Sequence, residues 1–188
     1  VGIPKTIDND LGMTESSIGF DTAVTVATEA LDRLQPTAAS HDRVIILEVM
    51  GRDAGHIALA TGIAGGADVI LIPEIPYSIE GVAKKIKAVK DTGRNFALVV
   101  VSEAVKKPTG ECLQIEHSGG EKRYGGIGAY LCAQITAATG SETRVTVLGH
   151  VQRGGAPTYS DRLIASAFGA KAVELIAAGK FDRLAVWR

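Results

Sequence analysis

Residues 44–52 read VIILEVMGR, a short and almost wholly apolar run that ends in a glycine and an arginine. Runs of this kind, rich in β-branched residues and bounded by turn residues, are typical of strands buried on both faces of a sheet. Comparable runs recur along the chain and alternate with longer segments whose apolar residues follow helical spacing. The expected strands are 44–50, 69–72, 96–102, 144–148 and, at the end of the chain, 184–187. This alternation predicts an α/β fold in which helices cover a mostly parallel sheet.

The segments between these strands are expected to be helices. The clearest is 79–90, where Ser78 is placed to cap the start and one face carries Ile79, Val82, Ile86 and Val89. Ser160 is placed to do the same for the last helix. The expected helices are 19–34, 53–64, 79–90, 128–138 and 160–178. Residues 105–123 form a polar, glycine-containing excursion, for which a flexible loop and a small hairpin both remain open.

Length and composition indicate one globular domain that acts on small molecules. The 188 residues are 46% hydrophobic and 22% charged, with a net charge of −1, which lacks the basic excess that a nucleic-acid partner requires. No apolar stretch approaches the ~20 residues of a membrane span, so no membrane anchor is expected. Cys112 and Cys132 have no metal-type spacing, which predicts free thiols in a reducing cytoplasm and no structural zinc. The chain lacks a starting Met and ends on an apolar run, so both ends are expected to be cut from something longer.

Glycines and polar side chains gather where the predicted strands end. Gly51-Arg52 follows the first strand, Ser102-Glu103 ends the third, and residues 149–155 (GHVQRGG) follow the fourth. Open α/β sheets bind ligands in the crevice beyond the carboxyl ends of their strands. Each glycine taken singly is better explained as an ordinary turn residue. Their coincidence with Arg, His and Glu at several strand ends nevertheless predicts a ligand site at this edge.

A second polar cluster precedes the first predicted helix, at residues 4–10 (PKTIDND). Phosphoryl transfer to an alcohol needs a carboxylate that accepts the hydroxyl proton and cations that offset the charge on the transferred group. Asp8 and Asp10 are both candidates for the base. The alternative is a turn held by Asx-type hydrogen bonds, and the spacing alone favours that alternative.

The motifs, taken in order, resemble those of the phosphofructokinases over essentially the whole chain. The matching segments are 6–10 (TIDND), 40–43 (SHDR), 48–52 (EVMGR), 102–103 (SE), 142–144 (ETR) and 149–155 (GHVQRGG). The resemblance implies a three-layer α/β domain at residues 1–188 that forms the sugar-phosphate-binding half of a longer two-domain enzyme. The implied reaction transfers a phosphoryl group from ATP or pyrophosphate to the 1-hydroxyl of fructose 6-phosphate, giving fructose 1,6-bisphosphate in glycolysis. A cytoplasmic homo-oligomer with shared active sites is implied as well.

The same resemblance implies roles for residues near the transferred group. Asp8 would be the general base, and Thr6 and Arg52 would lie near the transferring phosphoryl group. Asp10 would lie near a Mg²⁺ ion. Lys5 stands where well-studied bacterial ATP-dependent members have Gly and pyrophosphate-dependent members have Lys. Some ATP-using relatives also carry Lys there, so Lys5 does not decide the donor. As a substrate-binding residue, its ammonium could offset the charge on a pyrophosphate.

A further set of residues would hold fructose 6-phosphate. Met50, Gly51 and Glu103 would contact the sugar. His150 and Arg153 would bind the 6-phosphate, with Arg43 and Arg144 reaching in from a neighbouring subunit. A guanidinium suits this task because it presents a rigid, permanently charged fork to phosphate oxygens.

Two departures from the family pattern limit what this chain should do alone. The family's N-terminal half, with the donor site and the main magnesium aspartate, precedes Val1, so the fragment by itself is expected to be inactive. The effector-binding arginine of the allosteric bacterial enzymes is replaced by Gln35, which puts regulation by the usual nucleotide or phosphoenolpyruvate effectors in doubt.

Two other functions fit parts of the sequence. A non-catalytic sugar-phosphate-binding or regulatory module, like the degenerate halves of duplicated family members, is the main alternative. Such halves often lose the base, whereas this chain retains Asp8 together with Thr6, Asp10 and Arg52. Diacylglycerol and NAD kinases rank last, because they give no reason for phosphate-directed arginines at these strand ends.

Overall fold

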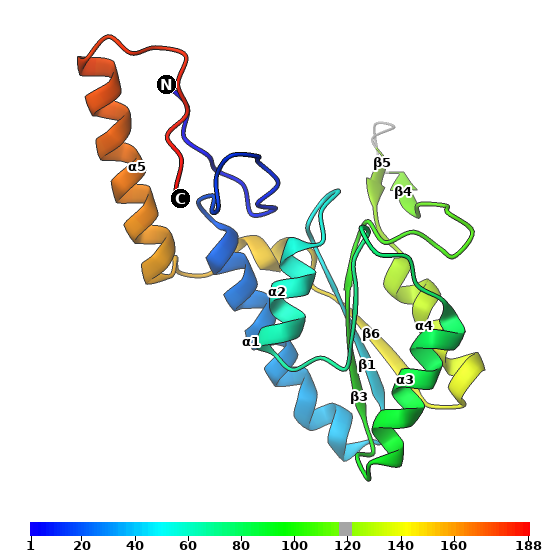
Figure 1. Ribbon diagram of the computed structural model, residues 1–188. Coiled ribbons are helices and arrows are strands. Elements are labelled where there is room, and N and C mark those ends of the chain that lie inside the picture. The colour runs from blue at the N-terminus through cyan, green and yellow to red at the C-terminus, as the bar shows by residue number, and fades with distance from the viewer. Residues whose placement is uncertain (117–121) are drawn as a thin grey trace.

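The computed structural model describes residues 1–116 and 122–188, and it has the predicted α/β architecture (Figure 1). Parallel strands form a four-stranded sheet in the order β2-β3-β1-β6, so the strand quoted first, β1, is central. The strands of this sheet are β1 (Val44–Val49), β2 (Val69–Leu71), β3 (Ala97–Ser102) and β6 (Thr143–Val147).

Helices cover both faces of the sheet and make a three-layer body (Figure 1). One face is covered by α1 (Phe20–Ser40) and α2 (His56–Ala64), and the other by α3 (Ile79–Asp91) and α4 (Ile127–Thr139). Successive residues of β1 alternate between the two layers: Val44 and Ile46 pack toward α3 and α4, whereas Ile45 and Leu47 pack toward α1 and α2. Because both faces are buried, every residue of the strand is apolar except Glu48.

The last helix and the chain ends lie to one side of this body (Figure 1). A short 3₁₀ helix, η1 (Gly149–Arg153), follows β6, and α5 (Tyr159–Ala177) extends away beyond it. The predicted strand 184–187 is wrong, because Leu184 makes only an isolated bridge to Gly2. The backbone of this segment forms hydrogen bonds with the N-terminal segment and not with the sheet. For example, Ala185 N donates to Gly2 O at 3.0 Å.

The end of α1 and the start of α2 differ from the prediction, the first because of tertiary packing and the second because of a local turn. The first helix was expected to end at residue 34, but α1 continues through Pro36 to Ser40. Ala38 is completely buried in the core beside it, so packing holds the final turns despite the proline. Helix α2 begins at His56 and not at Asp53, because the chain first makes a turn closed by Ala54 N donating to Gly51 O.

The two predicted caps had different outcomes. Ser78 does cap α3, and its hydroxyl accepts a hydrogen bond from Gly81 N. The prediction for Ser160 is wrong. The cap of α5 is Thr158, whose hydroxyl accepts from Asp161 N, and this places Ser160 inside the first turn.

The polar excursion after β3 contains a small hairpin, one of the two forms expected for it. Strands β4 (Gln114–Glu116) and β5 (Lys122–Tyr124) pair antiparallel, and residues 117–121 of the predicted excursion lie outside the described residues. The hairpin stands at the carboxyl edge of the main sheet (Figure 1). In the part of the chain that the structure describes, no helix has the length and apolar character to span a membrane.

Candidate active site

The side chain of Glu103, which follows β3, is hydrogen-bonded to the turn that follows β1. These strands are parallel neighbours with Val49 opposite Ser102, so their next residues are adjacent. Glu103 Oε1 accepts hydrogen bonds from the backbone amides of Gly51 (3.2 Å) and Arg52 (2.9 Å). Arg52 has φ 52°, a left-handed conformation that favours glycine, and the carboxylate stabilises this turn. A side chain at Gly51 would place its Cβ 2.4 Å from Ala54 O, so the tight turn requires glycine there.

A buried glutamine joins the end of β1 to η1. Gln152 is 1% exposed, and its Oε1 accepts a hydrogen bond of 2.9 Å from Met50 N. The same 3₁₀ helix carries His150 and Arg153, both exposed. Gln152 therefore holds Met50 beside the two residues predicted to bind a phosphate. Sequence reasoning assigned Gln152 no role, although a polar residue between two predicted ligands in a glycine-rich segment is a signal for a structural contact.

The loop that contains Thr6 and Asp8 faces these strand ends. The Thr6 hydroxyl donates to Asp8 Oδ2 at 3.2 Å, and Asp8 N donates to the same hydroxyl oxygen at 3.2 Å. Burial raises the pKa of the Asp8 carboxyl, and the charge of Asp10 adds to this, whereas the Thr6 hydrogen bond and the charges of Arg153 and Arg52 oppose it. Asp8 therefore lies close enough to Arg52 and Arg153, from two other segments, to interact with their charges.

Glu103 belongs to the same electrostatic group. Burial raises its pKa, and the charge of Asp8 raises it further. The two backbone hydrogen bonds from Arg52 and Gly51 act in the opposite direction, as does the charge of Arg153. Thus Asp8, Glu103, Arg52 and Arg153 form one cluster of two carboxylates and two guanidiniums at the carboxyl edge of the sheet, where ligands bind in folds of this class.

Lys5 and Asp10 border this cluster and are exposed. Lys5 makes an isolated parallel bridge to Ile18. Within the described residues, no group of three or more His, Cys, Asp or Glu side chains forms a metal cage. A lone carboxylate nevertheless fits Mg²⁺, because this ion usually takes one or two carboxylates and completes its shell with water and substrate phosphates. None of the hydrogen bonds and ion pairs of the described residues uses the Asp10 carboxylate.

Arg43 and Arg144 lie at the opposite edge of the sheet. Arg43 directly precedes β1, and Arg144 is the second residue of β6, so both stand where the strands begin. Glu142 holds them side by side, with its Oε1 at 3.0 Å from the Arg43 guanidinium and 2.6 Å from that of Arg144. The hydrogen bond from Arg43 lowers the pKa of Glu142, and the charges of both arginines add to this. These arginines do not join the Asp8 cluster of their own chain.

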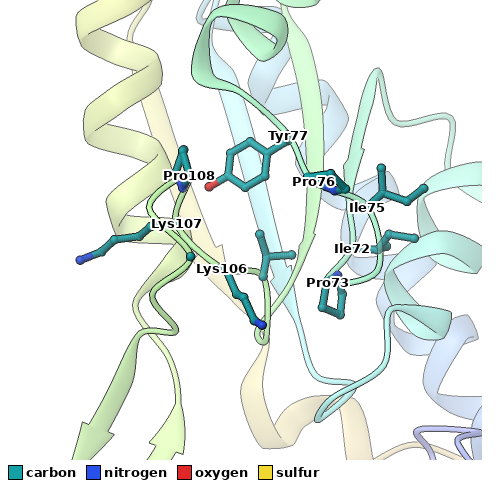
Figure 2. A pocket seen from close by; sticks show the side chains of 10 residues that line it. Ile72, Pro73, Ile75, Pro76, Tyr77, Lys106, Lys107 and Pro108 are labelled. Carbon is teal, nitrogen blue, oxygen red and sulfur yellow. The ribbon is translucent and has the colours of Figure 1, made fainter.

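Two pockets lie near the carboxyl edge. One, of about 200 Å³, lies between the Asp8 loop, the start of α1 and η1, and Arg153 and Gln152 line it. The other, also about 200 Å³, lies between the segments that follow β2 and β3 (Figure 2). Figure 2 shows Pro73 and Ile75 on one side of it and Lys106 and Pro108 on the other, with the Tyr77 ring between. None of the predicted site residues lines this second pocket, so it is not the candidate active site.

Comparison with known proteins gives a consistent set of relatives. The family profile described as Phosphofructokinase matches residues 1–176. Among curated proteins, the chain is 65% identical over 188 residues to "ATP-dependent 6-phosphofructokinase 1" of Synechocystis sp. and 52% identical over 188 residues to "ATP-dependent 6-phosphofructokinase" of Chloroflexus aurantiacus. All of this chain is covered in both comparisons, but only 52% of each relative. The chain therefore spans about half the length of the curated relatives it matches.

Solved structures that match this chain are phosphofructokinases as well. Phosphofructokinase from Saccharomyces cerevisiae superposes with a TM-score of 0.79 at 30% identity, covering 98% of this chain and 24% of that one. Pyrophosphate-dependent phosphofructokinase from Marinobacter aquaeolei gives a TM-score of 0.78 at 33% identity, covering 98% of this chain and 46% of that one.

Proposed function

Because this chain belongs to the phosphofructokinase family, we propose that it is the fructose 6-phosphate-binding half of an ATP-dependent 6-phosphofructokinase, with residues 1–188 as one domain. The observation that carries the proposal is that the Asp8 loop and the segments with Glu103, Arg52 and Arg153 come together at the carboxyl edge of the sheet. Glu103 is hydrogen-bonded to Arg52 N, and one pocket lies between the Asp8 loop and Arg153. A base beside two phosphate-directed cations is what phosphoryl transfer to a sugar hydroxyl requires. A non-catalytic binding module would have no need of the base.

In the proposed reaction, Asp8 accepts the proton of the 1-hydroxyl of fructose 6-phosphate as that oxygen bonds to the terminal phosphorus of ATP. The bond from this phosphorus to the bridging oxygen breaks, and ADP leaves. The raised pKa of Asp8 makes its carboxylate a stronger base than an exposed aspartate. Thr6 orients the carboxylate through its 3.2 Å hydrogen bond. Arg52 offsets the negative charge of the phosphoryl group during its transfer. The backbone turn at Arg52 is held by its hydrogen bond to Glu103.

Fructose 6-phosphate is then held along the carboxyl edge of the sheet. Met50, Gly51 and Glu103 contact the sugar, and His150 and Arg153 on η1 bind its 6-phosphate. Arg43 and Arg144 complete the phosphate clamp of a neighbouring subunit in a homo-oligomer. Their position supports this division, since the six residues of β1 separate Arg43 from Met50, a span of about 20 Å.

The donor proposed is ATP, because the curated relatives at 51–65% identity are named ATP-dependent, whereas the pyrophosphate-dependent solved structures are 30–33% identical. Lys5 lies beside the donor phosphates. Asp10 would help to hold Mg²⁺, which when bound would neutralise phosphate charge. Most of the donor site would belong to the half of the enzyme outside this chain, and the enzyme would act in the cytoplasm.

The test is steady-state kinetics of the full-length enzyme with fructose 6-phosphate and either ATP or pyrophosphate. We expect fructose 1,6-bisphosphate from ATP and a far lower rate from pyrophosphate. The isolated chain should give no turnover with either donor. Turnover with pyrophosphate alone would overturn the donor assignment, and no turnover of the full-length enzyme with either donor would favour the non-catalytic module.

A further inference from the structure

The loop that carries Asp8 is held by a second segment, residues 15–18, which runs beside it. Ser17 is completely buried, and its hydroxyl donates to Thr6 O at 2.6 Å. Ser17 N donates to the side-chain oxygen of Asn9 at 2.9 Å, and the Asn9 amide donates back to Glu15 O at 3.1 Å. Ser17 and Asn9 therefore join the loop to this segment on both sides of Asp8.

We call these hydrogen bonds of Ser17 and Asn9 the loop clamp, here shortened to the clamp. The backbone conformation of Asn9 is what allows its side chain to take part. Asn9 has φ 51°, in the left-handed region that few residues other than Gly and Asn adopt readily. That backbone conformation turns the Asn9 side chain so that both of its polar atoms are used by residues 15–17. Asp8, between Thr6 and Asn9, has Thr6 as the only side-chain partner among its described hydrogen bonds. The direction of the Asp8 carboxylate thus depends on how Thr6 and Asn9 are held.

The segment that holds the loop is itself tied to the folded body. Ile18 N donates to Pro4 O at 3.1 Å. One residue further, Gly19 N and Thr22 N donate to the carboxylate of Asp161 at 2.8 and 2.9 Å. Asp161 lies on α5, is 2% exposed, and supplies the cap that α1 lacks from its own preceding residues. The clamp therefore links the loop to the packed helices α1 and α5.

We propose that Ser17 and Asn9 are positioning residues for the phosphoryl-transfer step, which hold Asp8 at the angle needed to accept the sugar proton. The inference rests on the proposed function. A loss of the clamp should reduce turnover while leaving the sugar-phosphate contacts of Met50, Glu103, His150 and Arg153 in place. Misplacement of a reacting group by about 1 Å is enough to cost ~10²-fold in rate.

The experiment uses the full-length enzyme and three clamp variants. Ser17→Ala removes the hydroxyl, Ser17→Thr keeps it, and Asn9→Gly keeps the left-handed backbone while removing the amide. We expect Ser17→Ala and Asn9→Gly each to lower kcat about tenfold or more, with KM for fructose 6-phosphate within about threefold, and Ser17→Thr to recover most of kcat. The matched control is Thr139→Ala on α4, which also deletes a hydroxyl that donates to a backbone carbonyl but lies outside the loop.

A second measurement does not depend on activity. Amide hydrogen exchange of residues 6–9 should be faster in Ser17→Ala than in the parent, and unchanged in Thr139→Ala. The proposal is overturned if Ser17→Ala keeps the parent kcat, if KM rises as much as kcat falls, or if exchange in the loop does not change. Failure of the proposed function would be separate, since it would appear as absent turnover in the parent enzyme itself.

Discussion

Glu103 Oε1 accepts a hydrogen bond of 2.9 Å from the backbone amide of Arg52, so the residue after β3 fixes the turn after β1. In the proposed enzyme Glu103 would therefore have two tasks, which are to hold this turn and to contact the sugar. We predict that Glu103→Gln, which retains an acceptor, raises KM for fructose 6-phosphate and leaves kcat within a few-fold.

Glu103→Ala should do more, since it leaves the amides of Gly51 and Arg52 without their acceptor. Loss of a hydrogen bond to a charged group corresponds to about 1.5–3 kcal/mol, so kcat/KM should fall at least about tenfold below that of Glu103→Gln. Steady-state kinetics of the two variants side by side would check this. Equal kinetics for the Gln and Ala variants would show that the turn does not need the carboxylate.

Asp8→Asn should remove the proton acceptor and keep the shape. A positioned base typically contributes about 10² to 10⁴-fold, so kcat should fall in that range, while KM for fructose 6-phosphate should stay within a few-fold. Asp10→Asn is the matched comparison, and it should weaken the response to Mg²⁺ while keeping kcat at saturating metal. Near-normal turnover of Asp8→Asn at saturating substrate would rule out Asp8 as the base.

Arg43→Ala and Arg144→Ala should affect binding more than turnover. Both arginines lie at the start of the strands, away from Asp8, and they are proposed to complete a neighbour's phosphate clamp. Loss of a contact that is equally strong in the ground state and the transition state raises KM and leaves kcat unchanged. Arg33→Ala, an exposed arginine on α1, is the control. Equal falls in kcat and kcat/KM would contradict the assignment.

Glu48→Gln should change the dependence of stability on pH. Glu48 is 3% exposed, and burial raises the pKa of its carboxyl despite the 2.8 Å hydrogen bond from Gly128 N. A raised folded-state pKa means that the favourable contribution is present below the unfolded-state pKa and is lost as the pH rises through the folded-state pKa. The Gln variant should therefore have a higher Tm than the parent at pH 7, and the difference should vanish at low pH.

Thermal unfolding of the full-length enzyme across this pH range would measure the effect. For a domain of this size, each 1 kcal/mol corresponds to about 2–4 °C in Tm. Glu29→Gln, an exposed position on α1, controls for a general effect of removing one carboxylate. A Tm of Glu48→Gln that lies below the parent at pH 7 and does not vary with pH would refute the prediction.

The amino-acid sequence by itself determined the local elements. The apolar run at residues 44–50 became β1, with almost the predicted bounds, because a strand buried on both faces favours apolar side chains, and Glu48 is the one charged residue in it. Ser78 capped α3 because this cap is made between near neighbours, with its hydroxyl accepting a hydrogen bond from Gly81 N. The ordered motifs also carried the family resemblance, because motif order is a property of the chain and not of its packing.

Tertiary structure alone decided what distant residues do together. Gln152 lies 102 positions from its hydrogen-bond partner Met50. Asp161 lies 142 positions from Gly19 and accepts a hydrogen bond from the Gly19 amide. Neither pair could be inferred from spacing, since contact requires β6 to pack beside β1 and α5 to pack on α1. Packing likewise explains why α1 continues beyond Pro36 and why residues 184–187 pair with the N-terminal segment and not with the sheet. Local patterns reflect interactions between near neighbours, whereas these features depend on which buried surfaces meet once the whole chain is folded.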